Sequence, residues 1–292
     1  MAARSNVSAM NPEWWSAMMQ IPLRKSLVAV EVANTEFEAT LNMGDTVHFP
    51  YWQELSVVDY TPGTDITGAQ DITATDETLV VDQKKVVRFY VDDIEAMQAK
   101  YGYATTLAED GAYQLRDAID TFVLAKTVSA VSALDAGDIG GTSGSAITST
   151  TANIIDTYVQ ARRKLRQMNV EEAGDWISVV TPSVAANIEQ KTTDSGFSVA
   201  DASLRNGFAG TFVGFRVYVS NNLPSASYGG TNSDLLYIGR AKQIHAVVQR
   251  APSITIRPAE KRLGAFFYPN TVYGGKVFEK AKNRFLRVPV KR

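Results

Sequence analysis

The sequence contains no cysteine and only two histidines among its 292 residues. The lack of cysteine excludes disulfides, thiolate zinc sites, iron–sulfur clusters and cysteine nucleophiles. Neither His48 nor His245 has a second histidine at the spacing of metal ligands, so we expect no metal site and no cofactor. His48 alternates within an expected strand and His245 lies in an apolar stretch, so both are interpreted as structural residues.

Long apolar runs and nucleotide-binding motifs are also missing. No stretch of about 18 apolar residues exists, so no transmembrane helix and no membrane partner are expected. Residues 1–19 lack the apolar core of a signal peptide. Gly140–Gly144 lacks the Lys-Ser/Thr ending of a P-loop, and no GxSxG elbow is present. A Ser-His-Asp triad assembled in space stays open, which keeps a hydrolase as the alternative from another functional class.

Lysine and arginine are absent from residues 26–83, which carry eleven acids. Residues 240–292 carry thirteen bases and two acids, although the whole chain has a net charge of −2. Two oppositely charged ends attract each other within one chain or between neighbouring chains, and this affects orientation and partner choice more than stability. The other interpretation is a chance segregation of solvated charge. The near-neutral total predicts only weak, non-specific contact with double-stranded DNA.

The order of expected elements is mixed, which favours the α+β class. Residues 104–134 show helical periodicity and would span about 45 Å, long enough for a spine that crosses the molecule. A Gly/Ser/Thr-rich connection follows at residues 135–151. We further expect helices at 153–168 and from 182, and strands at 176–180, 215–219, 235–238, 254–256, 273–278 and 285–290.

A long two-stranded excursion is expected before the spine. Residues 45–58 predict a strand with a break at Pro50, residues 59–78 a polar acidic loop, and residues 79–91 a returning strand. A two-stranded ribbon is marginally stable alone in water, so it must lie on something, and a neighbouring subunit is a good candidate. The expected contact residues on this excursion are Asp59, Asp65, Asp71 and Asp76.

The N-terminal segment carries too many large apolar groups for a free tail. Trp14 and Trp15 are followed by Met18 and Met19. They need a surface to pack against, which is either the chain's own core or a neighbouring subunit. Trp14 and Trp15 are therefore candidate inter-subunit contacts.

The segment Leu204–Pro224 reads LRNGFAGTFVGFRVYVSNNLP. A glycine-punctuated turn leads into a strand in which Phe215, Val217 and Val219 share one face, and Pro224 ends the pairing. This segment resembles the central segment of major capsid proteins of tailed bacteriophages with the Hong Kong 97-type fold. The order of the other elements, through the terminal Tyr273–Val277, resembles that family over nearly the full chain.

The resemblance implies a Hong Kong 97-type capsid fold with five regions. They are an N-terminal arm (1–38), an extended loop with flanking strands (39–91), a peripheral domain with the spine helix (92–148), an axial domain (149–249), and C-terminal strands that return to the peripheral domain (250–292).

The resemblance also implies the function of a major capsid protein, without catalysis. The chain would assemble with itself into hexamers and pentamers of an icosahedral shell that encloses double-stranded DNA. Some relatives carry a long N-terminal scaffolding extension that this chain lacks, so a separate scaffolding protein is expected. A portal protein and decoration proteins are further expected partners. The expected location is the virion capsid, assembled in the host cytoplasm. An encapsulin-like compartment shell is the alternative within the same fold.

Overall fold

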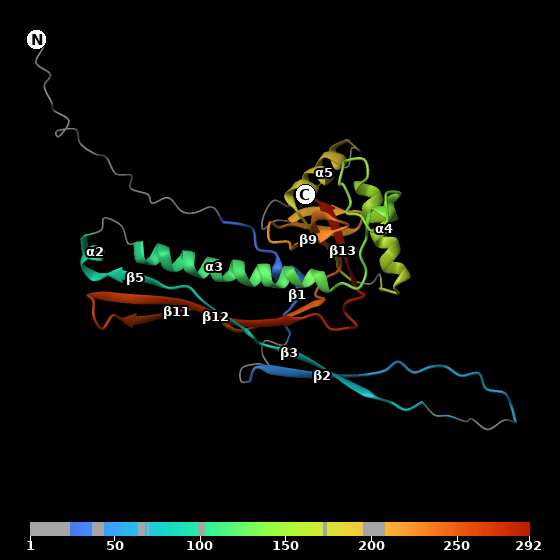
Figure 1. Cartoon of the computed structure of the whole chain (residues 1–292), viewed down its shortest axis with the longest axis horizontal. Helices are drawn as coiled ribbons and strands as arrows, with labels where there is room; N and C mark the ends of the chain where they lie inside the picture. The colour runs from blue at the N-terminus through green and yellow to red at the C-terminus, as the bar shows by residue number, and fades with distance from the viewer. Residues whose placement is uncertain are drawn as a thin grey trace, which may run out of the picture.

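The computed structural model describes residues 24–36, 44–63, 68, 70–98, 103–171, 174–194 and 208–292. Trp14, Trp15 and Asp65 lie outside the described residues. Two sheets and a long helix form the body, and a two-stranded ribbon projects from it (Figure 1). The mixed architecture confirms the α+β class.

The first sheet has five strands, in the order β1-β11-β12-β4, with β5 also paired to β12. Its strands are β1 (Ala33–Asn34), β4 (Gln83–Val86), β5 (Phe89–Asp92), β11 (Ile244–Pro258) and β12 (Gly264–Lys276). The hairpin of β11 and β12 forms most of this sheet. The pairing of these two strands has register shifts between Val248 and Arg250 and between Arg250 and Ser253. The side chain of Asp92 accepts a hydrogen bond from the Ile94 amide at 2.9 Å and so caps α2 (Asp93–Gln98).

The long helix α3 (Tyr103–Ala125) lies along this sheet (Figure 1). It packs closely, because a Cβ on Gly111 would come within 2.9 Å of Pro269, and Phe122 contacts Tyr273 with ring centres 5.2 Å apart. Its 23 residues span about 35 Å.

The expected helix over 104–134 is too long at its C-terminal end. A short 3₁₀ turn, η2 (Lys126–Ser129), follows α3, and Ala130 then adopts an extended conformation. The Leu134 amide donates to the Arg287 carbonyl at 3.0 Å. Backbone groups beyond residue 129 therefore pair with a distant strand, which a helical periodicity in the sequence does not reveal.

The second sheet has six strands, in the order β13-β10-β6-β8-β7, with β9 paired to β10. Its strands are β6 (Trp176–Val180), β7 (Phe208–Phe212), β8 (Phe215–Val219), β9 (Ser225–Tyr228), β10 (Thr231–Arg240) and β13 (Phe285–Lys291). Helices α4 (Ile154–Gln167) and α5 (Pro182–Asp194) pack with it. The connection before α4 holds a second 3₁₀ turn, η3 (Ala136–Ile139). The main core lies here and includes buried residues of the short helix α1 (Ala29–Val32).

The β7–β8 turn explains the glycine pattern of the Leu204–Pro224 segment. Val213 and Gly214 both have positive φ, 50° and 83°, as a two-residue hairpin turn requires. Phe215 and Val217 are buried as predicted, while Val219 is only half-buried. Tyr218, which the alternation places on the other face, is also buried, and its hydroxyl donates to Glu31 at 3.2 Å. The segment around α1 therefore covers that second face.

The expected division between residues 249 and 250 does not coincide with the sheets. Strand β11 crosses it, and its first half already belongs to the five-stranded sheet. Strand β13 pairs with β10 from Phe285 to Lys291, so this C-terminal strand joins the six-stranded sheet instead of returning to the sheet beneath α3. The reason is non-local pairing, since a strand's partner is set by register and not by its place in the sequence.

Candidate assembly surfaces

The ribbon consists of β2 (Thr46–Trp52) and β3 (Ala74–Val80), paired antiparallel from Thr46–Val80 to Trp52–Ala74. His48 and Asp76 lie on adjacent strands, and His48 Nδ1 is 2.5 Å from Asp76 Oδ2. The predicted excursion is present, but its returning strand is β3 instead of residues 79–91, most of which form β4 and β5 of the five-stranded sheet. Asp76, however, lies in β3 and not in a loop, because pairing with β2 extends the strand into the predicted loop.

The base of the ribbon is fixed to the five-stranded sheet. Phe49 packs on Phe278 with ring centres 4.7 Å apart. The buried Glu77 carboxylate accepts the Glu279 amide at 3.1 Å and lies 3.6 Å from Lys276 Nζ. A Cβ on Gly274 would come within 2.3 Å of the Val80 carbonyl oxygen, so only glycine permits the strands to approach this closely. The base is therefore part of the folded body.

The outer part of the ribbon is apolar and exposed. Beyond Trp52 and Ala74 its two sides are joined by side chains, since Gln70 Oε1 accepts from the Ser56 amide at 2.9 Å and Gln70 Nε2 donates to the Glu54 carbonyl at 3.1 Å. Val57 is 98% exposed. The exposed large apolar residues of this ribbon tip are Trp52, Leu55, Val57, Val58, Tyr60 and Ile72. Such a group marks a surface that another molecule covers.

The four acidic residues expected at a contact do not all lie in the same part of the structure. Asp59 and Asp71 are exposed and belong to the ribbon tip. Asp76 is exposed in β3 beside His48, and Asp65 lies outside the described residues, as do Trp14 and Trp15. The ribbon tip therefore combines acidic and apolar side chains, and the apolar part was not anticipated. The sequence signal for this apolar part was the alternation of Leu55 and Val57 within a polar region.

A complementary surface lies on the five-stranded sheet. Around β4 and the β11–β12 turn, basic and large apolar side chains are exposed together. We use the name basic sheet surface for the exposed basic and large apolar residues of this region, which alternate between the two faces of the sheet and lie beside Asp92 and Asp93. They are Lys84, Lys85, Val86, Arg88, Ile254, Ile256, Arg257, Lys261, Arg262 and Leu263. Glu260 is the acid within the turn. Apolar residues with surrounding basic groups match the chemistry of the acidic ribbon tip.

The two surfaces point in opposite directions in one chain. The ribbon runs away from the body at one end, while the β11–β12 turn lies beside α2 and β5 at the other end (Figure 1). A contact between them therefore joins two copies head to tail.

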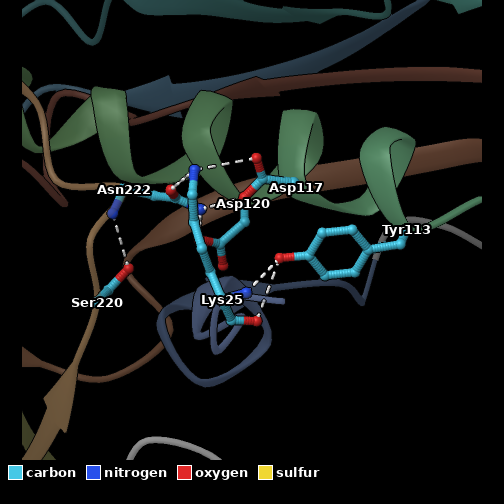
Figure 2. Close-up of polar contacts among 6 residues, drawn as sticks. All are labelled: Lys25, Tyr113, Asp117, Asp120, Ser220 and Asn222. Atoms are coloured by element: carbon cyan, nitrogen blue, oxygen red, sulfur yellow. Dashed lines mark hydrogen bonds and ion pairs between the residues drawn. The ribbon is translucent and has the colours of Figure 1, made fainter. Parts of the chain in front are cut away.

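A polar junction ties the N-terminal segment to both parts of the body (Figure 2). Asn222 Nδ2 donates to Asp117 Oδ1 at 2.7 Å and to Asp120 Oδ2 at 2.8 Å, both on α3. Lys25 Nζ donates to Asn222 Oδ1 at 3.0 Å and to Asp117 Oδ2 at 3.2 Å. The backbone amide of Asn222 donates to Ser220 Oγ at 3.1 Å.

The same junction holds α1. Asp120 Oδ1 accepts the amides of Val28 and Ala29 at 2.7 and 2.6 Å. The hydroxyl of Tyr113, which lies nearer the N-terminus of α3, accepts a hydrogen bond from the Lys25 backbone amide at 2.5 Å. Three segments far apart in the sequence thus meet in hydrogen bonds around α3.

Sequence reasoning treated Asn221–Pro224 as the end of the strand and missed this role of Asn222. Asn222 is buried, while its neighbour Asn221 is exposed. A Ser-x-Asn pattern directly after a buried strand is the signal that points to the junction, since short polar side chains there bond to backbone and nearby side chains.

The described residues contain no group of three or more His, Asp or Glu side chains that could hold a metal ion. His245 is half-buried and packs against Phe278 with ring centres 4.5 Å apart and ring planes tilted by 46°, and its burial lowers its pKa, against a smaller opposite effect of Glu36. Among the described helices none is both long and apolar enough for a membrane span.

Comparisons with known proteins agree with a structural subunit. The family described as "Phage capsid protein" matches residues 75–277, more than half of the chain. No curated protein matches. A solved structure from Mycobacterium phage Che8 is 25% identical with a TM-score of 0.76, over 95% of this chain and 96% of that one.

Two further capsid structures share the fold at lower identity. The capsid of Cyanophage P-SCSP1u is 15% identical with a TM-score of 0.71, over 99% of this chain and 96% of that one. The mature capsid of bacteriophage PhiM1 is 14% identical with a TM-score of 0.68, over 96% and 92%. The chain therefore belongs to the phage capsid protein family, as a major capsid protein that forms the shell of the virion and not as an enzyme.

Proposed function

We propose that the chain builds an icosahedral shell of hexamers and pentamers around double-stranded DNA by laying the ribbon tip of each copy on the basic sheet surface of the next. The observation that carries this proposal is the ribbon tip itself, which exposes apolar and acidic side chains far from the chain's own core. A monomer gains nothing from such an element, whereas a neighbour can cover it.

The energy of the contact comes from its apolar part. Complete burial of a large apolar side chain contributes about 1.5–3 kcal/mol. The tip offers Val57 and Leu55 among others, and the sheet surface offers Ile256 and Leu263. The opposite charges contribute less to affinity, but they orient the two copies and disfavour a like-charged pairing.

Closure follows from the head-to-tail arrangement. A heterologous contact repeated by rotation gives a ring, and rings of five and six copies are the units of a closed shell. The firmly anchored base of the ribbon, around Phe49 and Glu77, fixes the direction in which the tip projects.

We keep the regions that the family resemblance implies, but we set their boundaries by the sheet to which each strand belongs. We assign the ribbon as the extended loop and α3 as the spine of the peripheral domain. The six-stranded sheet with α4 and α5 is assigned as the axial domain, which takes β13 in addition to residues up to Arg240.

Other partners rest on the resemblance alone. A separate scaffolding protein, a portal protein and decoration proteins belong to this proposal, as does assembly in the host cytoplasm. The lack of cysteine is compatible with that reducing compartment.

A charge exchange tests the central contact. Asp59→Lys with Asp71→Lys should leave the isolated subunit folded by circular dichroism but reduce shell yield, measured by sedimentation after co-expression with the scaffolding protein. Arg257→Glu with Arg262→Glu should do the same, and the four changes together should restore shells. Glu109→Lys, at an exposed site on α3, is the matched control. Normal shells from both double variants would refute the proposal. Unfolding of the tip variant would show that the tip belongs to the core.

A further inference from the structure

The outer edge of β11 is open along its second half. β11 lies at the margin of the five-stranded sheet, with β12 between it and β5 (Figure 1). Strand β1 pairs with it at Ile244 and His245. Among the residues that the structure describes, none pairs with the outer edge from Ile254 to Pro258. An open edge of this kind carries unpaired backbone groups, which another strand can bind.

The hydrogen bonds of β12 show which residues of β11 face outward. The Pro269 carbonyl accepts from the Val87 amide at 2.9 Å, so the backbone of Pro269 points away from β11. Pro269 is the partner of Ile254, and the pairing is regular from residue 253 onward. Opposite residues of antiparallel strands alternate between hydrogen-bonded and non-hydrogen-bonded pairs. The N–H and C=O groups of Ile254 and Ile256 therefore point out from the sheet.

The turn end of β11 leads to the same assignment. The Ala259 amide donates to the Gly264 carbonyl at 3.0 Å, so these two opposite residues form a hydrogen-bonded pair. Counting back along the strand in steps of two, residues 257 and 255 also bond to β12. Ile254 and Ile256 again face outward, and their side chains are 43% and 58% exposed.

The ribbon tip offers a matching edge. Gln70, on one arm of the ribbon, donates to the Glu54 carbonyl and accepts from the Ser56 amide on the other arm. These two groups therefore point into the ribbon. Since successive residues of an extended chain point their backbone groups to opposite sides, the N–H and C=O groups of Leu55 and Val57 point outward. Both side chains are also exposed.

We propose that the outer edge of β11 binds residues 54–57 of a second copy as an added antiparallel strand, and the inference rests on the proposed function. Val57 then lies opposite Ile254, and Leu55 lies opposite Ile256. Each of these pairs exchanges two backbone hydrogen bonds, because all four residues point their backbone groups outward. The five-stranded sheet of one copy thus continues into the ribbon of the next.

Prolines and charge select this register. Pro252 and Pro258 flank the two isoleucines, and proline has no N–H to donate. A strand centred between residues 254 and 256 therefore uses both donors of this window. The antiparallel register also places Glu54 opposite Arg257, which is an attractive cross-strand pair. A parallel strand would place Glu54 near Ser253 and lose that pair.

The apolar side chains of the added strand extend a layer that the fold already contains. Pro269 lies against α3, since a Cβ on Gly111 would come within 2.9 Å of its ring. Side chains directly opposite each other share a face, so Ile254 lies on the same face as Pro269. Leu55 and Val57 join that face. A strand added at the edge contacts both faces of the sheet, so the basic and apolar residues of the basic sheet surface can both contribute.

Two proline substitutions at neighbouring positions test the backbone contact. Val57→Pro removes an N–H that bonds to the next copy, whereas Val58→Pro removes one that faces the other arm of the ribbon. Both valines are exposed. Val57→Pro should raise the concentration needed for assembly about tenfold, and Val58→Pro should stay within about twofold of wild type. Circular dichroism checks that both isolated subunits are folded, and equal assembly thresholds would overturn the proposal.

Introduced cysteines test the register, because the chain has none of its own. Val57→Cys with Ile254→Cys places the two Cα atoms about 5.5 Å apart between copies, within disulfide range. Leu55→Cys with Ile254→Cys is the diagonal control, at about 7–8 Å, beyond that range. Shells are assembled under reducing conditions and then oxidised. Denaturing gels should show covalently linked subunits for the first pair alone, and equal or greater linking of the diagonal pair would refute the register.

The proposed function and the added strand fail in different ways. Normal shells from the charge variants of the ribbon tip and the basic sheet surface would count against the ribbon contact as a whole. Shells that depend on those charges, combined with equal assembly of the two proline variants, would keep the ribbon contact and refute the added strand.

Discussion

Asn222 Nδ2 lies 2.8 Å from Asp120 Oδ2, and this hydrogen bond joins the segment that follows β8 to the C-terminal part of α3. Asp120 is 2% exposed, and its other oxygen accepts two amides from the start of α1. A buried carboxylate requires such donors, because an unsatisfied buried charge is strongly destabilising. The bond therefore couples the N-terminal segment, the spine helix and the six-stranded sheet.

Replacing Asn222 by Ala should destabilise the subunit by about 2–3 kcal/mol, since two hydrogen bonds to carboxylates are lost in a buried site. Chemical denaturation measures the change. Asn221→Ala is the matched control, because this neighbour is exposed, and it should stay within about 0.5 kcal/mol of wild type. Equal effects of the two substitutions would contradict the assigned role of the junction.

Replacing Leu55 and Val57 by Ser should leave the unfolding of the isolated subunit unchanged, because both side chains are mostly exposed. The concentration needed for assembly should rise at least about tenfold, given the apolar burial that is lost. Light scattering during assembly measures this threshold. Val131→Ser, exposed outside the ribbon, controls for a general loss of surface apolarity, and a threshold equal to wild type would refute burial of the tip.

Replacing Trp14 and Trp15 by Ala should weaken assembly more than it lowers the melting temperature of the isolated subunit. The reason is that Trp is enriched at protein–protein interfaces, and we propose that a neighbouring copy covers these two side chains. Calorimetry and sedimentation provide the two readouts. Comparable losses in both would show that the tryptophans pack within their own chain.

Acid should destabilise the ribbon base through His245. Burial lowers its pKa below the usual 6.5, so the unfolded chain takes up this proton at a higher pH than the folded chain. The unfolded state then binds more protons as the pH falls through about 6.5 toward the lowered folded pKa, and stability decreases over that window. Denaturation midpoints at several pH values should show the decrease.

His245→Gln should remove this part of the pH dependence, while His48→Gln, at the other histidine, should retain it. A pH profile of His245→Gln that is superimposable on the wild-type profile would refute the assignment.

The sequence predicts those parts of the fold that local patterns determine. Strand β6 begins and ends where the apolar run predicts, and α5 begins at Pro182 after Thr181, as expected for a capped helix with proline in its first turn. The ribbon follows from a polar acidic stretch between two β-rich segments. For β6 and α5 the signal lies within about ten consecutive residues, whereas for the ribbon it is the composition of three consecutive segments over residues 45–91.

The remaining elements depend on distant partners. Strands β11 and β12 have 15 and 13 residues, although only short pieces of each were predicted, because their outer halves gain order from cross-strand pairing and are partly exposed. The bond between Lys25 and Asn222 joins residues 197 positions apart. The sequence shows the charge and polarity of such residues, but only the folded chain shows that they meet.

The pairing of β13 with β10 sets a sequence of events during synthesis. The ribbon, at residues 46–80, leaves the ribosome long before Phe285–Lys291, which is made after every other strand of its sheet. The six-stranded sheet therefore stays incomplete while the ribbon tip is already present. Because domains fold as units, a nascent chain cannot present a finished subunit to its neighbours. With the ribbon contact that we propose, we expect completion of β13 to precede the assembly of each copy.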